Sequence, residues 1–191
     1  KITRTGLAGD SQGDTRHHGG PEKAVHHYPA DHYGEWRKEG IEAAAPAFGE
    51  NITTRGLSES DICIGDVFRV GSALLQVSQG RQPCWRLNAR FNRPDMAVRV
   101  QKSGRTGWYY RVLEEGWAEA GDALVLRGRP QPDWPLARTI ELLYTRTMDM
   151  ESLDTLSKLP ERAQSWRDLA ARRIATLQGE DGNRRLHDSG A

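Results

Sequence analysis

Short runs of alternating apolar and polar residues dominate the middle of the chain, between residues 48 and 127. The runs at 67–70 and 73–78 are separated only by Gly71 and Ser72, which are enough for a two-residue hairpin loop. Two further runs, in "GWYYRVLEEG" and "GDALVLRGRP", show the same alternation. Several short strands punctuated by Gly, Asp and Pro are typical of a β-barrel or a β-sandwich.

The chain before this region is predicted to be mostly loop, because five glycines within residues 6–20 interrupt any regular period. The segment "KAVHHY" is predicted to form a short strand. The segment "PADHYGEWRKEG" is predicted to form a helix, with Pro29 in its first turn and Gly40 just past its end. Further along, "RPDMAVRVQKSG" fits both periods, and the spacing of Met96 and Val100 favours a helix.

The pattern changes after the proline-rich stretch "RPQPDWP" at 129–135. Apolar stripes with helical spacing follow at 140–144, 150–156 and 159–177, and Pro160 begins the last of them. Helices this short cannot each bury an apolar face alone, so the three are expected to pack on one another. The chain is therefore expected to divide into a mainly β domain (1–135), a three-helix domain (136–178) and a polar, disordered tail (179–191).

The composition narrows the classes of partner. The chain has 27 basic and 26 acidic residues among 191 and a net charge of +1, so bulk charge does not favour nucleic acid or an acidic membrane. No apolar run reaches the length that a bilayer requires. Cys63 and Cys84 are too few for a disulfide scaffold, so a reducing, cytoplasmic setting is expected.

Five of the six histidines lie within residues 17–32. A zinc site is one interpretation, but the spacing is poor for it, and His26 and His27 would point to opposite faces of a strand. In "HHGGPEKAV" the two glycines can bring backbone N–H groups close to a ligand, while Lys23 adds a charge and His18 a donor. This segment is a candidate phosphate cradle, although Gly-Gly-Pro is also typical of an ordinary turn.

The segment "FGENITTRG" places Asn51 and Thr53 at the start of a strand-like run. An asparagine amide offers both a donor and an acceptor, which suits the edge of a heterocycle. An ordinary polar turn explains the same residues without a ligand, and the pattern alone favours the turn.

The two cysteines have different surroundings in the sequence. Cys63 lies between two isoleucines and is predicted to be a small buried apolar residue. Cys84 lies in "QPCW" between Arg81 and Arg86, and nearby cations favour the thiolate, which attacks carbon or binds a metal. A nucleophile would also need a histidine base, which the histidine-rich loop could supply. A purely structural cysteine stays open on spacing alone.

Taken together, these segments resemble the MOSC domain, the C-terminal module of molybdenum cofactor sulfurases, and above all its YiiM-like branch with a C-terminal three-helix domain. The resemblance covers nearly the whole chain. It is carried, in the family's order, by "GDSQGDTRHHGGPEKAVHHYP", "FGENITTRGL", "CIGDVFRVGSALLQVSQ", "QPCWRLNARF" and "SGRTGWYYRVLEEG". The family implies a strongly bent, barrel-like β fold that binds a pyranopterin molybdenum cofactor. Pyridoxal phosphate binding is also described at the level of the family.

The resemblance also implies roles for particular residues. The family's cysteine ligand to molybdenum matches only Cys84, which becomes the expected metal ligand and catalytic residue; a thiolate would complete the soft ligand set begun by the dithiolene sulfurs. The cofactor's phosphate calls for cations and N–H groups, and its rings call for hydrogen bonds and an aromatic wall. Trp108 suits that wall, or equally a place in the core. The expected cofactor-binding residues are His18, Lys23, Asn51, Thr53, Arg86 and Trp108.

Proteins similar to this one reduce N-hydroxylated compounds, including hydroxylamino purines and hydroxylamines. The sequence has no glycine-rich nucleotide fingerprint and no cysteine cluster for an iron–sulfur centre. We therefore expect no intrinsic flavin or iron–sulfur group, and electrons supplied by a separate flavin or iron–sulfur reductase. A monomer or a homodimer is expected.

Two other functions stay open at this stage: a carrier or storage protein for molybdenum cofactor, and a carrier of sulfur as a persulfide on Cys84. The three C-terminal helices contain no acid–base cluster, so docking of a redox partner or dimerisation is their expected role. Four arginines are candidates for a docking surface on the third helix, against the alternative of an ordinary solvated face: Arg162, Arg167, Arg172 and Arg173.

Overall fold

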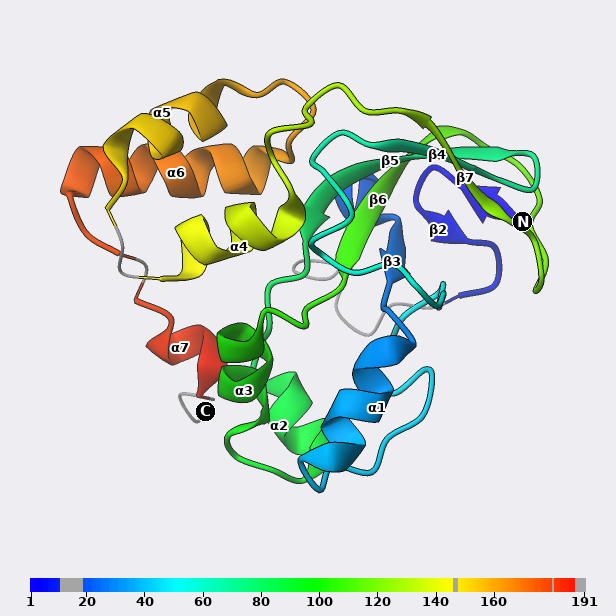
Figure 1. Ribbon diagram of the computed structural model, residues 1–191, viewed down its shortest axis with the longest axis horizontal. Coiled ribbons are helices and arrows are strands. Elements are labelled where there is room, and N and C mark those ends of the chain that lie inside the picture. The colour runs from blue at the N-terminus through cyan, green and yellow to red at the C-terminus, as the bar shows by residue number, and fades with distance from the viewer. Residues whose placement is uncertain (11–18, 146–147, 180, 188–191) are drawn as a thin grey trace.

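The computed structural model describes residues 1–10, 19–145, 148–179 and 181–187, and it combines a five-stranded antiparallel sheet with helices on two sides (Figure 1). The strands are β1 (Ile2–Thr3), β2 (Gly6–Leu7), β3 (Val25–His27), β4 (Val67–Val70), β5 (Ala73–Gly80), β6 (Trp108–Glu114) and β7 (Leu124–Gly128). The helices are η1 (Pro21–Lys23), α1 (Asp31–Lys38), α2 (Arg86–Phe91), α3 (Met96–Ser103), α4 (Leu136–Tyr144), α5 (Met150–Lys158), α6 (Gln164–Thr176) and α7 (Asn183–Leu186).

The sheet has the order β3-β6-β5-β4-β7, while β1 and β2 form a separate hairpin. The outer edge of β3 meets a single parallel bridge, from His27 to Ile52, and among the described residues β7 pairs with β4 alone. The strands therefore do not close into a barrel, and helices contribute more residues than strands. The expected mainly β, barrel-like fold is correct for the antiparallel strands and has to be corrected to an open sheet in a mixed fold.

The hairpin predicted at Gly71 and Ser72 is confirmed, since β4 and β5 pair antiparallel up to Val70 and Ala73. Gly71 has a φ of 53°, and a Cβ there would lie 2.1 Å from the carbonyl oxygen of Trp117, so only glycine fits this turn. The other expected strands are present as β3, β6 and β7, and the two expected helices as α1 and α3.

The larger of two hydrophobic cores fills the space between the sheet and the helices α4, α5 and α6 (Figure 1). Val77 of β5 and Leu143 of α4 are fully buried in it. At the end of β5, a Cβ on Gly80 would lie 2.9 Å from Ile140 Cδ1 and 3.1 Å from Trp166 Cη2. The absence of a side chain at Gly80 therefore allows two helices to pack closely on the strand that leads to Cys84.

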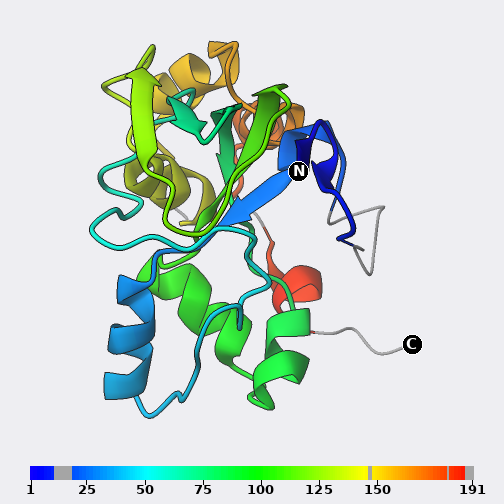
Figure 2. The same ribbon diagram turned by 90° about the vertical axis from the view of Figure 1, so that its right-hand side faces the viewer.

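The second core lies among α1, α2, α3 and α7, which form a helical layer below the sheet (Figure 2). The rings of Tyr28 and Phe48 stack at 4.1 Å, and Trp36 Nε1 donates to the hydroxyl of Tyr28 over 2.7 Å. Leu186 of α7 is also part of this core. The segment between the two layers contains Cys84, so packing on both sides fixes its position.

Two short helices differ from the expectation. The helix α2 follows Cys84 directly and was not predicted, because it is short and of its residues only Leu87 is buried. The tail was expected to be disordered, but residues 183–186 form α7. This helix is ordered because the apolar side chain of Leu186, only 8% exposed, packs into the second core.

Two of the four arginines expected on a docking surface are buried, and Arg162 lies just before α6 and not on it. Arg162 is fully buried, and it donates to the carbonyl oxygens of Ser157 and Trp166, each over 3.1 Å. Arg173 is 2% exposed and donates to the carbonyl oxygens of Leu142 and Thr145 at the C-terminal end of α4. Both arginines are buried, and Arg173 and Nη2 of Arg162 bind carbonyl groups at the C-terminal ends of α4 and α5, so they are not available to a partner.

We expect Arg173→Leu to lower the free energy of unfolding by about 2–4 kcal/mol, because it leaves buried carbonyl oxygens at the end of α4 without their charged donor. The neighbouring Arg172 is exposed, so Arg172→Ala should change stability little. Urea unfolding of both variants measures the difference. Equal midpoints would contradict a role for Arg173 in closing α4.

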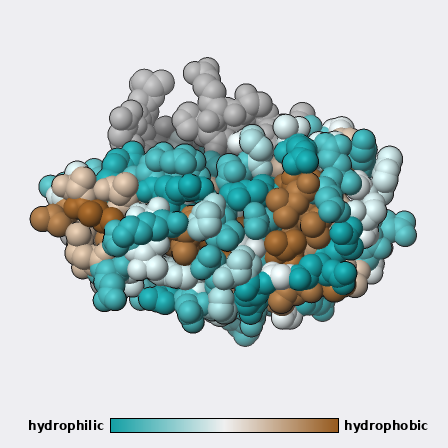
Figure 3. Space-filling view, turned by 90° about the horizontal axis from the view of Figure 1, so that it is seen from above, coloured by the Kyte–Doolittle hydropathy of each residue, from teal (hydrophilic) through white to brown (hydrophobic). Residues whose placement is uncertain are grey.

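The surface is mostly polar. Seen from above, hydrophilic residues cover most of this face and separate small apolar areas (Figure 3). The large hydrophobic side chains that are exposed are Trp117, Val125, Leu126, Met150 and Leu177. Among the described residues, none of the helices is both long enough and apolar enough to cross a membrane.

Candidate functional site around Cys84

Cys84 lies in the segment 81–85, which has no regular secondary structure and connects the end of β5 to the start of α2. Its side chain is half-buried, and its carbonyl oxygen accepts from the backbone N–H of Leu87 over 3.0 Å. At the start of the segment, the N–H of Arg81 donates to the carbonyl oxygen of Gly107 over 2.9 Å. The thiol is thus held between a strand end and a helix start while part of it stays accessible.

One face of the sheet contributes polar side chains next to this segment. His26 of β3 and Gln79 of β5 both lie opposite Tyr109 of β6, so the three side chains share a face. The rings of His26 and Tyr109 lie 4.9 Å apart between centroids. The Oε1 of Gln79 accepts from the hydroxyl of Ser165 over 2.9 Å, which joins this face to α6.

The charges of the site interact with one another. Burial lowers the pKa of the Lys23 ammonium, and the negative charge of a Cys84 thiolate partly opposes that change. Burial also raises the pKa of Tyr109, while the Arg81 guanidinium acts in the opposite direction. Burial and the charge of Arg81 hold the pKa of His26 well below its usual range, so its imidazole is neutral. Lys23 therefore lies near the thiol, while Arg81 and the neutral His26 lie with it around Tyr109.

Two buried nitrogen atoms in this site have no hydrogen-bond partner in the part of the chain that the structure describes. They are Nη1 of Arg81, whose residue is 8% exposed, and Nε2 of His26, whose residue is 4% exposed. Buried polar atoms are rarely left unpaired, so these donors are available for a ligand that is anionic or rich in acceptors. Together with the soft sulfur of Cys84 and the charge of Lys23, they suit a phosphorylated, sulfur-ligated metal cofactor.

Three other residues expected to bind the cofactor are not placed at Cys84 by the structure: Asn51, Thr53 and His18. Asn51 Oδ1 accepts from the N–H of His26 over 2.9 Å, so it fixes the backbone of β3. Thr53 is exposed and donates to Glu50 over 3.3 Å, and both Asn51 and Thr53 border a hollow of about 310 Å³ beside β1. His18 lies outside the described residues. Of the other expected residues that the structure describes, Lys23 lies close enough to Cys84 for their charges to interact, and Arg86 follows Cys84 by two residues at the start of α2.

Trp108 and Arg86 have surroundings of their own. Trp108 is fully buried in the larger core, and its ring lies 4.2 Å from that of His27. Of the two roles that the sequence left open for Trp108, an aromatic wall for the cofactor or a place in the core, its position fits the core. Arg86 is exposed at the start of α2, with its guanidinium carbon 5.8 Å from the centre of the Trp85 ring.

The other cysteine is confirmed as a buried residue. Cys63 is 2% exposed, and its Sγ donates weakly to the carbonyl oxygen of Pro132 over 3.6 Å. Burial and the nearby Asp66 carboxylate raise the pKa of the Cys63 thiol. A protonated, enclosed thiol is a poor nucleophile and a poor metal ligand, so Cys84 is the better candidate for chemistry.

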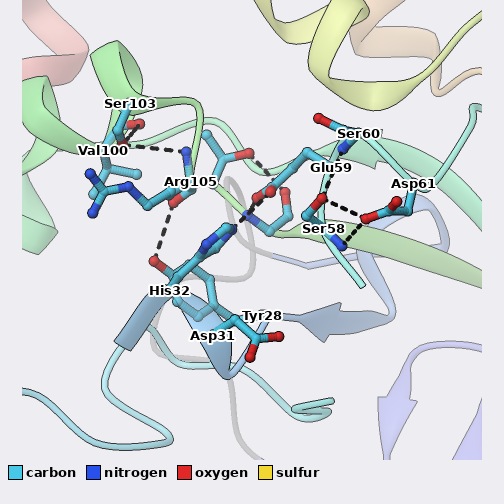
Figure 4. Close-up of polar contacts among 12 residues, drawn as sticks. Tyr28, Asp31, His32, Ser58, Glu59, Ser60, Asp61, Val100, Ser103 and Arg105 are labelled. Carbon is cyan, nitrogen blue, oxygen red and sulfur yellow. Dashed lines mark hydrogen bonds and ion pairs between the residues drawn. The ribbon is translucent and has the colours of Figure 1, made fainter. Parts of the chain in front are cut away.

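A buried pair, His32 and Glu59, supports the backbone at Gly107, which in turn binds the start of the Cys84 segment. His32 Nε2 and Glu59 Oε2 lie 2.8 Å apart, and Glu59 Oε1 accepts from the N–H of Gly107 over 2.7 Å (Figure 4). The pair borders a cleft of about 640 Å³ between α3 and α4. Since the carbonyl oxygen of Gly107 accepts from the N–H of Arg81, Gly107 connects Glu59 to the Cys84 segment.

Comparison with known families matches residues 14–125 to the MOSC domain and residues 134–177 to the YiiM-like 3-alpha helix domain. The chain belongs to the MOSC domain family. The resemblance inferred from the motifs is confirmed, including the branch with the three C-terminal helices.

Relatives of this MOSC protein are similar over most of its length. Protein YiiM of Escherichia coli is 39% identical over 189 residues, covering 97% of this chain and 84% of YiiM. The crystal structure of YiiM from E. coli superposes with a TM-score of 0.88 at 36% identity, over 97% of this chain and 90% of that one. A protein of Gibberella moniliformis named "Reductase" is 37% identical over 164 residues. The match covers 83% of this chain and 29% of the fungal protein.

Several residues of the candidate site were not among those expected from the sequence. His26, Gln79 and Tyr109 come together only through the pairing of β3, β6 and β5, and the register of that pairing is not written in any one segment. Arg81 was noted only for its charge beside Cys84. The alternation in "KAVHHY" and "GWYYRV" was the available signal, because it places His26 and Tyr109 on faces opposite to their apolar neighbours.

Proposed function

We propose that this protein is a molybdenum-cofactor-dependent reductase of N-hydroxylated compounds, with Cys84 as the protein ligand to molybdenum. MOSC domains are associated as a family with binding of molybdenum cofactor. The observation that carries the proposal is the half-buried Cys84 beside Lys23, together with two buried nitrogens, on Arg81 and His26, that have no partner among the described residues. The name "Reductase" of a fungal relative supports the class of reaction.

Each side chain has a defined task in this proposal. The Cys84 thiolate holds the metal, and Lys23 and Arg81 neutralise the anionic groups of the cofactor. When bound, the cofactor supplies the two-electron chemistry that removes the hydroxyl oxygen. The net reaction, R–NHOH + 2H⁺ + 2e⁻ → R–NH₂ + H₂O, also requires two protons. Lys23, whose pKa burial lowers, is a stronger proton donor than an exposed lysine, and the neutral His26 can donate or accept at Nε2.

The electrons come from outside this chain in the proposal, from a flavin or iron–sulfur reductase. The occupants of the site are the cofactor and a small N-hydroxylated substrate. The proposed setting is the cytoplasm, since two cysteines in the whole sequence are too few for a disulfide scaffold.

The test is to purify the protein from a molybdenum-replete host and to measure molybdenum and pterin together. The same preparation is then assayed with reduced viologen as electron donor and hydroxylamine or a hydroxylamino purine as substrate. Molybdenum and pterin in equal amounts, with formation of the amine, would support the reductase. Cofactor without turnover would indicate a carrier instead, and a persulfide on Cys84 without molybdenum would indicate sulfur transfer.

Lys23→Ala should weaken retention of the cofactor. A charge-assisted hydrogen bond is worth about 1.5–3 kcal/mol, which corresponds to an affinity about 10- to 150-fold weaker. Lys102→Ala is the matched control, because Lys102 is exposed on α3. The measurement is the pterin content after extended dialysis. Equal pterin in both variants would place the anionic group of the cofactor away from Lys23.

A further inference from the structure

The short C-terminal helix α7 lies directly against the Cys84 segment, although about a hundred residues separate them in the sequence (Figure 1). The backbone N–H of Trp85 donates to the carbonyl oxygen of Arg185 over 2.7 Å. The guanidinium Nη1 of Arg185 in turn donates to the carbonyl oxygen of Pro83. One residue of α7 therefore binds the backbone on both sides of Cys84.

Arg185 also joins this segment to two other elements. Its Nη2 donates to Oε1 of Gln101 on α3 over 2.8 Å, and its guanidinium carbon lies 5.5 Å from the centre of the Tyr144 ring on α4. A planar guanidinium can make such contacts at once, because its donors have a fixed geometry. Arg185 therefore connects the Cys84 segment both to α3 in the helical layer and to α4, the first of the three C-terminal helices.

The neighbouring residues keep α7 in place. Leu186 is buried in the second core, so the helix has an apolar anchor. The carbonyl oxygen of Leu186 accepts from Asn88 Nδ2 over 2.8 Å, and Asn88 Oδ1 accepts from the N–H of Ala97 over 2.8 Å. Asn88 thus connects α2, α3 and α7, and α7 cannot move away without breaking these contacts.

We propose that α7 acts as a clamp on the Cys84 segment and that Arg185 is a positioning residue for the Cys84 thiol. The segment has no regular secondary structure of its own. Fixing the carbonyl of Pro83 and the N–H of Trp85 restricts the backbone rotations on either side of Cys84, which sets the direction of its sulfur. The consequence for metal binding rests on the proposed function, whereas the effect on the thiol itself does not.

The test measures the thiol directly in the cofactor-free protein. In a Cys63→Ser background, Cys84 is the only cysteine of the sequence, and its rate of alkylation by iodoacetamide reports how freely it moves. Arg185→Ala should raise that rate about tenfold, which corresponds to about 1.4 kcal/mol. Arg185→Lys, which retains a charge that can reach Pro83, should restore part of the protection. Arg172→Ala, at an exposed arginine on α6, should leave the rate unchanged.

Thermal unfolding of each variant separates positioning from general stability. A lower melting temperature in Arg185→Ala with an unchanged alkylation rate would overturn the clamp, and so would a rate that Arg185→Lys does not bring down. Molybdenum and pterin content, measured on the same variants, distinguishes the two proposals. If the parent protein never retains molybdenum, the proposed function fails while a protected thiol still supports the clamp. If the parent protein retains normal cofactor but Arg185→Ala does not raise the alkylation rate, the clamp fails while the proposed function stands.

Discussion

Cys84→Ser is expected to remove molybdenum-dependent reduction while the protein stays folded. A serine hydroxyl is a harder ligand and ionises far less readily than a thiol, so the metal loses its protein sulfur. Activity should fall more than about 100-fold, beyond what changes to residues that merely support a ligand cause. Cys84 is half-buried, so the free energy of unfolding should change by less than about 1 kcal/mol. Assay with reduced viologen and urea unfolding measure the two effects.

The matched control is Cys63→Ser, which changes the same atom in a different environment. Cys63 is 2% exposed, so its hydroxyl would be buried with an imperfect partner, and a modest loss of stability should accompany nearly normal activity. The pair of variants should therefore have opposite profiles. Full activity in Cys84→Ser, or an essential Cys63, would contradict the assignment of the metal ligand.

The sequence predicted the secondary structure well where periodicity was strong and local. The β4–β5 hairpin, the strands β6 and β7 and the helices α1 and α3 all come from segments whose apolar spacing and turn residues agree. The helix α2 and the helix α7 lack a full apolar stripe, and each is stabilised by contacts with distant segments. Closure of the barrel was wrong because it depends on whether the edge strands β3 and β7 meet, which no local pattern determines.

The sequence predicted the main reactive residues of the candidate site, but not all of the residues that surround them. Cys84 and Lys23 carry distinctive side chains in distinctive motifs, and both lie at the site. His26 and Tyr109 join them through strand register, and Arg185 through the docking of α7. Residues brought together by long-range pairing cannot be assigned from sequence spacing, because the sequence gives each a position along its own element and no partner.

Backbone groups matter in this site as much as side chains. Gly107 accepts from the N–H of Arg81 through its carbonyl oxygen and donates to Glu59 through its own N–H. Glu59 is itself fixed by His32. A displacement at Gly107 would therefore reach the Cys84 segment on one side and the buried His32–Glu59 pair on the other.

Gly107→Ala is expected to have a large effect for this reason. Gly107 has a φ of 67°, and a Cβ there would lie 2.3 Å from the carbonyl oxygen of His27 and 3.2 Å from His26 Nε2. Backbone strain alone costs about 1–3 kcal/mol, and a clash with a fixed strand carbonyl adds to it. Because the peptide has to shift, its bond to Arg81 should weaken, and retention of the cofactor should fall together with stability.

Gly104→Ala is a close control, three residues earlier in the same loop. Gly104 has a φ of 71°, which is nearly the same backbone conformation, but a Cβ there would meet nothing within 4 Å. The control carries the same backbone cost of a left-handed alanine, about 1–3 kcal/mol, without the clash. Urea unfolding and pterin content of the two variants therefore isolate the contact of Gly107 with β3. Equal losses in both variants would mean that only the backbone conformation matters, and that close packing at Gly107 does not help to hold the Cys84 segment.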